Sequence, residues 1–174
     1  MKSRSQIQQA HEDAVLRDAL AEHNRLHGLV LSVVSRPDPP DAILSDGGIT
    51  TWMELTDAFF SQEWARSLSS HGSVKGHTPM RNGEFMDMNR QFAVNFCDLV
   101  QQKANKKSYA STIASYGPGI LVVGLESPWL NRKTMDEISN EWATRGAPDI
   151  SGTFDLVYTR HRTAMGGVVL SWPH

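Results

Sequence analysis

The chain has 174 residues, of which 40% are hydrophobic and 21% are charged, and its formal net charge is -2. This composition is that of an ordinary globular protein, and the length suits a single domain over residues 1–174. A net charge so close to zero excludes a general electrostatic attraction to nucleic acid, so DNA binding would require a local basic patch.

The hydrophobic segments and the cysteine content indicate the compartment. The longest apolar run, residues 120–125, is too short to span a bilayer, and the polar N-terminus lacks the apolar segment of a signal peptide. Cys97 is the single cysteine, so an internal disulfide is excluded, and its apolar neighbours predict a core position. We therefore expect a cytoplasmic protein that does not enter a membrane.

Residues 5–27 predict a first helix that ends at Gly28. Its apolar stripe consists of Leu16, Ala19, Leu20 and Leu26. Glu12 and His23 fall on the same stripe at 100° per residue. An unpaired carboxylate is costly to bury, so Glu12 is either a functional group or a residue at the helix start, where the stripe reaches solvent. His23 is interpreted as a hydrogen-bonded histidine at the edge of the core.

Residues 29–34 predict a buried strand, and a proline-rich connector follows it. Residues 41–44 and 49–56 then predict a hairpin around the turn Asp46-Gly47-Gly48. This hairpin places Asp41 and Glu54 on adjacent strands. Paired carboxylates repel each other and lose hydration unless a cation joins them, and Mg²⁺ or Mn²⁺ is the usual partner. The alternative is that Asp41 caps a turn and Glu54 lies on a solvated strand face.

Two further helices are predicted, over residues 57–68 and 90–114, with a long loop over residues 69–89 between them. The apolar face of the second helix is formed by Phe92, Phe96, Leu99 and Val100. Lys103 and Lys107 continue the centre of that face, and Lys106 lies at its margin. Inward lysines require an anionic partner, which would be the carboxylates, a phosphate or both. The alternative is that the helix leaves the core after Val100 and that its lysines are solvated.

The C-terminal part predicts a central strand over residues 119–125, a helix over 133–143, and two strands over 154–159 and 167–172 joined by a turn at 163–166. The element order is therefore α-β-β-β-α-α-β-α-β-β. This order predicts an α/β fold with a mixed central sheet and helices on both of its faces.

Three features of this succession resemble the PD-(D/E)XK, or restriction-endonuclease-like, nuclease superfamily. They are Pro40-Asp41, Glu54-Leu55-Thr56, and the acidic Glu12 on the first helix. The resemblance covers residues 12–123 and implies a helix-hairpin-helix-strand core that carries the catalytic carboxylates on its hairpin. The family normally has a lysine where this chain has Thr56. Some branches take that lysine from a neighbouring helix, and here it would be Lys103 or Lys107.

The resemblance implies metal-dependent hydrolysis of phosphodiester bonds in DNA. The metal ligands that it implies for one Mg²⁺ or Mn²⁺ ion are Asp41, Glu54 and the carbonyl of Leu55. Glu12 would orient a water or assist a second ion. Lys103 or Lys107 would hold the attacking hydroxide or the phosphate.

Two other functions stay open at this point. Without a lysine at position 56, the chain could be an inactive nuclease-fold domain that binds nucleic acid or a protein partner. It could also be a small α/β domain whose carboxylates have only a structural part. Four arginines could contact the phosphates of a nucleic acid, but scattered arginines are usually solvated, and we interpret them in this way: Arg36, Arg81, Arg160 and Arg162.

Overall fold

The computed structural model describes residues 4–71, 87–163 and 166–172. Its helices are α1 (Arg4–His27), α2 (Gln62–His71), α3 (Met88–Ala104), the 3-10 helix η1 (Lys107–Tyr109), α4 (Ala110–Tyr116) and α5 (Arg132–Thr144). Its strands are β1 (Ser32–Ser35), β2 (Ala42–Ser45), β3 (Thr50–Phe59), β4 (Gly119–Glu126), β5 (Phe154–Thr163) and β6 (Gly166–Trp172). Residues 72–86 of the predicted long loop and residues 164–165 of the predicted last turn lie outside the described residues.

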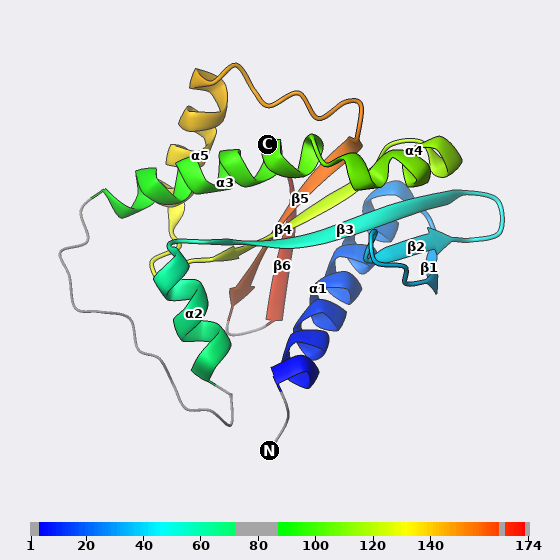
Figure 1. Cartoon of the computed structure of the whole chain (residues 1–174), viewed down its shortest axis with the longest axis horizontal. Coiled ribbons are helices and arrows are strands. Elements are labelled where there is room, and N and C mark those ends of the chain that lie inside the picture. Colours follow the sequence, from blue (N-terminus) through cyan, green and yellow to red (C-terminus); the bar gives the residue numbers. More distant parts are fainter. Residues whose placement is uncertain (1–3, 72–86, 164–165, 173–174) are drawn as a thin grey trace.

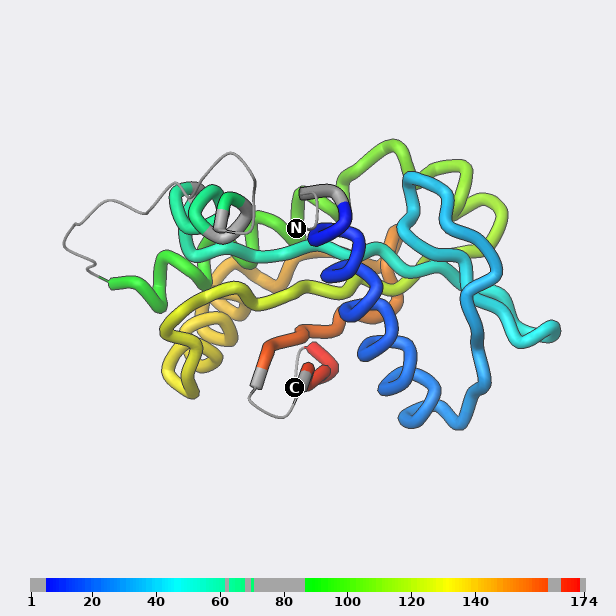
Figure 2. Tube along the Cα trace, turned by 90° about the horizontal axis from the view of Figure 1, so that it is seen from below, coloured from blue at the N-terminus to red at the C-terminus, as the bar shows by residue number. Residues whose placement is uncertain are grey.

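The strands form one mixed sheet in the order β1-β2-β3-β4-β5-β6. The central pairs β3-β4 and β4-β5 are parallel, and the outer pairs are antiparallel. Helices α3 and α5 cover one face and α1 covers the other (Figure 1). In Figure 2, which views the molecule from below, α1 crosses in front of the strands. The predicted α/β fold with a mixed central sheet and helices on both faces is confirmed.

Two hydrophobic clusters hold the helices to the sheet. On one face, Phe92 and Phe96 of α3 pack with Trp52 of β3. On the other face, Val15 and Leu16 of α1 belong to a cluster that contains Met53 of β3. Because successive side chains of a strand point to opposite faces, neighbouring residues of β3 contribute to different clusters. Strand β4 is buried from Gly119 to Leu125, as predicted for a central parallel strand.

The predicted hairpin is confirmed, and its turn has a local chemical cause. The Asp46 carboxylate accepts hydrogen bonds from the backbone N–H groups of Gly48, at 2.9 Å, and Ile49, at 2.8 Å. Gly47 has φ of 92°, a left-handed conformation that favours glycine. The pairing of Ala42 with Met53 fixes the register of β2 on β3.

Three predicted elements are corrected by the structure. Strand β1 is an exposed edge strand rather than a buried one. Strand β3 continues to Phe59, where a helix from residue 57 was expected, because its parallel ladder with β4 extends to the pair Phe59–Glu126. The predicted helix 90–114 is interrupted after Ala104, because Lys106 has an extended backbone conformation. No helix in the described part of the chain is long and apolar enough to cross a membrane.

Candidate functional site

A buried ion pair joins the hairpin to helix α3. Glu54 lies in the middle of β3, is only 4% exposed and faces α3. Lys103, in the last turn of α3, places its Nζ atom 2.7 Å from Glu54 Oε1. The predicted inward direction of Lys103 is thus confirmed. Lys106 adds a weaker contact, with its Nζ atom 3.7 Å from the same oxygen.

Tyr109 completes this side of the site and was missed by the sequence analysis. Its side chain is fully buried, and the Lys106 ammonium lies 4.9 Å from the centre of its ring. Burial, followed by the nearby Glu54 carboxylate, raises the pKa of the Tyr109 phenol, so a neutral hydroxyl lies close to the ion pair. The helical pattern could not place Tyr109 at the site, because Tyr109 belongs to η1, whereas the sequence predicts one continuous helix over residues 90–114.

Lys107 does not reach this site, and the prediction that it points inward is wrong. It begins η1 and is exposed, and no ion pair of Lys107 is found among the described residues. The physical cause is the break at residues 105–106, which ends the 3.6-residue period on which the prediction depended. Lys103, before the break, keeps its place on the inward face.

Asp41 lies one residue before β2, at the edge of β3. Its Oδ2 atom accepts a hydrogen bond of 2.7 Å from the backbone N–H of Leu55. This bond holds the Asp41 carboxylate against the edge of β3. Burial, and then the negative charges of Glu54 and Glu12, raise the pKa of Asp41 to about 6 despite the Leu55 N–H and Lys103.

The predicted hairpin brings Asp41 and Glu54 near each other, but Asp41 precedes β2 and only Glu54 lies on a strand. The ladder of β2 with β3 begins at the pair Ala42–Met53, next to both residues. Glu54 is bound by Lys103 on the α3 side, whereas Asp41 is bound by the backbone of Leu55. The N–H and C=O of one strand residue point to the same edge, so the Leu55 carbonyl faces the side on which Asp41 lies.

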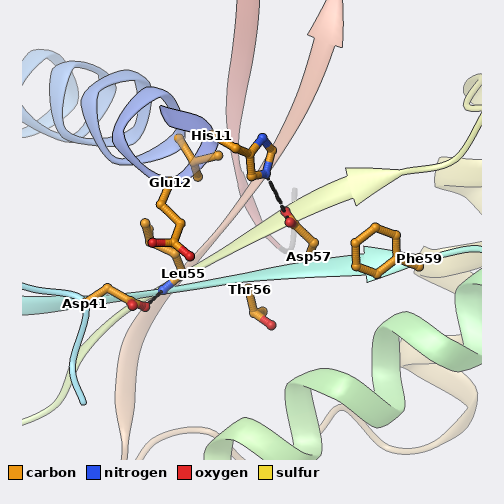
Figure 3. Close-up of a pocket in the computed structure, with 8 residues that line it drawn as sticks. His11, Glu12, Asp41, Leu55, Thr56, Asp57 and Phe59 are labelled. Carbon is orange, nitrogen blue, oxygen red and sulfur yellow. Dashed lines mark hydrogen bonds and ion pairs between the residues drawn. The ribbon is translucent and has the colours of Figure 1, made fainter. Parts of the chain in front are cut away.

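A pocket of about 260 Å³ opens between α1 and β3. The residues that line it are His11, Glu12, Val15, Asp41, Leu55, Thr56, Asp57 and Phe59. Figure 3 shows Glu12 reaching from α1 toward Leu55 and Asp41, while Thr56 points away from α1. Glu12 is half-buried and accepts a 3.0 Å hydrogen bond from Gln8. Glu12 and Asp41 thus line one pocket, which Glu54 does not line.

The same pocket contains a histidine–carboxylate pair that the sequence analysis missed. His11 Nε2 lies 3.0 Å and 3.2 Å from the two carboxylate oxygens of Asp57 (Figure 3). The hydrogen bond to Asp57 raises the pKa of His11, although burial opposes the shift. Glu126, at the end of β4, lies in the same cluster. The available signal was the position of Glu126 directly after an apolar parallel strand, where ligand sites of α/β sheets concentrate.

Two interpretations away from the site also have an outcome. His23 is buried, and its Nδ1 atom lies 2.9 Å from the hydroxyl of Tyr158, so its interpretation as a satisfied core histidine is confirmed. Arg160 is 3% exposed and forms a 2.9 Å ion pair with Asp18, so its interpretation as solvated surface is wrong. Arg162 is exposed, and Arg81 lies outside the described residues.

Comparison of the chain with models of protein families, with curated proteins and with solved structures finds no match. The chemistry of the site is therefore inferred from its own geometry and charges.

Proposed function

We propose that this chain is a metal-dependent nuclease that hydrolyses phosphodiester bonds in DNA on a restriction-endonuclease-like core. The observation that carries the proposal is the 2.7 Å contact between Lys103 Nζ and Glu54 Oε1. It brings the amine of Lys103 from a neighbouring helix to Glu54. This amine would replace the lysine that the family normally has where this chain has Thr56.

A hard divalent cation, Mg²⁺ or Mn²⁺, would fit the edge of β3 once Glu54, which does not line the pocket that holds Asp41, exchanged its contact with Lys103 for one to the ion. The ligands would be the carboxylates of Asp41 and Glu54 and the carbonyl of Leu55, an all-oxygen set of the kind that these ions prefer. The raised pKa of Asp41 supports this fit, because burial and neighbouring acids disfavour a lone carboxylate where a cation would stabilise it. When bound, the ion would polarise a phosphoryl oxygen and lower the pKa of a coordinated water.

The chain's own groups would perform the remaining tasks. Hydrolysis adds a water oxygen to phosphorus, breaks one P–O ester bond and delivers a proton to the departing oxygen. Lys103 would hold the attacking oxygen or a phosphoryl oxygen with a compact positive charge. Glu12, which lines the same pocket as Asp41, would accept a hydrogen bond from the attacking water and orient it.

A second candidate is a nuclease-fold domain that binds nucleic acid or a protein partner without cutting. The burial of Glu54 favours it, because this carboxylate is only 4% exposed and is already bound by Lys103. Glu54 also does not line the pocket that holds Asp41 and Glu12. Catalysis would require Lys103 or Glu54 to exchange this contact for one to metal or phosphate.

Cleavage of plasmid DNA and of single-stranded DNA by the purified chain, with Mg²⁺ or Mn²⁺, tests the proposal. Lys103→Met should reduce the rate by about 100-fold or more, a loss typical for removal of a charge that stabilises the transition state. Lys107→Met is the matched control and should keep the activity, because Lys107 is exposed and lies beyond the helix break.

The outcomes separate the two candidates. Cleavage that depends on metal, Asp41 and Lys103 supports the nuclease. A wild-type chain that binds DNA with metal present but never cuts it supports the non-catalytic domain. Equal rates for Lys103→Met and Lys107→Met would contradict the part assigned to Lys103.

A further inference from the structure

His11, Asp57 and Glu126 form a cluster apart from the Glu54–Lys103 ion pair. Each offers one ligand atom, and these three atoms lie within 4.8 Å of one another. We propose that this cluster is a binding site for a divalent transition-metal ion, Zn²⁺ in the first place. The proposal does not depend on the nuclease function, since it involves other residues and another ion.

The distances suit a shared ion. Two ligand atoms that are each about 2.0–2.2 Å from one zinc ion are separated by roughly 3.3–3.6 Å at tetrahedral angles. His11 Nε2 lies 3.0 Å and 3.2 Å from the Asp57 oxygens. The imidazole and the carboxylate therefore already stand close to the spacing that coordination requires, and a Glu126 oxygen lies within 4.8 Å of both ligand atoms.

The three ligands come from three elements, which the fold holds together. His11 is on α1, whereas Asp57 and Glu126 stand near the carboxyl ends of the parallel strands β3 and β4. Asp57 pairs with Gly124, and Glu126 follows two residues later on the same face. A Cβ atom at Gly124 would overlap Asp57 Oδ1, so the carboxylate occupies the space that a missing side chain leaves.

The donor types select the metal. One imidazole with two carboxylates suits Zn²⁺ and related first-row ions, whereas Mg²⁺ prefers oxygen ligands alone. Two carboxylates beside one imidazole also supply negative charge to a dication. The positive charge of Arg162 opposes cation binding at this cluster. It lowers the pKa of His11, whereas the charges of Asp57 and Glu126 raise it.

The site is accessible and has room for further ligands. His11 and Asp57 both line the pocket of about 260 Å³ between α1 and β3. The three ligating residues are half-buried. Three protein ligands with a free position beside a pocket are the arrangement of zinc sites that bind water or a substrate group.

Isothermal titration of the purified 174-residue chain with ZnCl₂, without DNA, tests the site, and Co²⁺ absorption reports the ligand geometry. The wild type should bind one ion in this cluster. His11→Gln, Asp57→Asn and Glu126→Gln should each weaken binding by at least about 10-fold, and far-UV circular dichroism verifies that the variants are folded. Arg162→Gln should tighten binding.

Two control variants locate the ion. His27→Gln should leave the affinity unchanged, although His27 is on the same helix and its ring lies 4.5 Å from that of His23. Asp13→Asn, an exposed carboxylate on the same helix, should also leave it unchanged. The titration contains no DNA, so a failed cleavage assay does not affect this result. No Zn²⁺ binding by the wild type, unchanged affinity in both His11→Gln and Glu126→Gln, or a loss in His27→Gln or Asp13→Asn alone would overturn the proposal.

Discussion

The Lys103 ammonium and the Glu54 carboxylate lie 2.7 Å apart, although they are 49 positions apart in the chain. Both groups are withdrawn from water, with 18% and 5% of their side-chain surfaces exposed. Removing one partner of such a pair leaves a buried charge without compensation, which costs more than the pair contributes relative to an apolar substitute. This contact is therefore a test of structure as well as of function.

Lys103→Met should lower the free energy of unfolding by about 3 kcal/mol, the usual cost of an uncompensated buried charge. Lys106, with its Nζ atom 3.7 Å from Glu54, should compensate part of the loss. Lys107→Met should change the free energy of unfolding by less than about 0.5 kcal/mol, as exposed substitutions do. Urea unfolding at pH 7 measures both values.

The double variant Lys103→Met/Glu54→Met separates the charge from the packing. Because it removes both charges, it should recover most of the stability that Lys103→Met loses. A double variant as unstable as the single one would show that the lysine stem, rather than its charge, stabilises the junction of α3 with β3.

Sequence predicted the fold where the cause is local or periodic. The Asp46-Gly47-Gly48 turn specifies the hairpin by its own hydrogen bonds, and the apolar run of β4 specifies a strand that is covered on both faces. The end of β3 could not be predicted, because its residues are extended only through their pairing with β4. Sheet pairing there overrides the local preference for a helix start.

The same distinction applies to the site. Lys103 was predicted by its helical period, and Asp41 and Glu54 were predicted by the hairpin register. The prediction that Lys107 points inward failed because the helix breaks at residues 105–106, and no proline or glycine there indicates a break. Asp57 and Glu126 come together only through the parallel pairing of two strands that are distant in sequence, and no spacing in the chain encodes that contact.

Asp41 should make stability depend on pH in the absence of metal. Its pKa is raised from 3.8 to about 6 in the folded chain, so between these values the folded state binds more protons than the unfolded state. Stability from this group is therefore lost as pH rises through that window. Asp41→Asn removes the charge and should be more stable than the wild type at pH 7 by on the order of 1 kcal/mol, after allowance for solvent screening.

Urea unfolding of both proteins from pH 3.5 to 7.5 measures this difference in stability. The difference should vanish as the pH falls below the pKa of an ordinary aspartate, 3.8. Millimolar Mn²⁺ should reverse the order at pH 7, because an ion that binds only the folded wild type stabilises it by mass action. A wild type whose melting temperature does not respond to Mn²⁺ or Mg²⁺ would argue for a structural Asp41.

The buried pair Arg160–Asp18 should be a second determinant of stability. Arg160 is 3% exposed, and its Nη2 atom lies 2.9 Å from Asp18 Oδ2. Asp18→Asn leaves the guanidinium without its counter-charge and should cost about 3 kcal/mol of unfolding free energy. Asp13→Asn, on the same helix but with an exposed pair to Arg36, should cost less than about 1 kcal/mol. Similar losses in both variants, measured by thermal unfolding, would contradict this difference.

Gly124 should control the position of Asp57 and, through it, the protonation of His11. A methyl group at residue 124 overlaps Asp57 Oδ1 while the strand backbone stays acceptable for alanine, so Gly124→Ala should displace the carboxylate rather than unfold β4. The hydrogen bond to Asp57 is the largest cause of the raised pKa of His11. Its loss should therefore lower that pKa, and an NMR titration of the His11 ring measures the change.

Gly152→Ala provides the matched control, because a Cβ atom there meets nothing within 4 Å and the pKa of His11 should stay where it is. Asp57→Asn should lower the pKa in the same direction as Gly124→Ala, since both remove the carboxylate from Nε2. If Gly124→Ala left the pKa of His11 raised while Asp57→Asn lowered it, the Asp57 carboxylate would still lie beside His11 Nε2 in the Gly124→Ala variant. The missing side chain at 124 would then not be what positions Asp57, and Gly124→Ala should bind Zn²⁺ as tightly as the wild type.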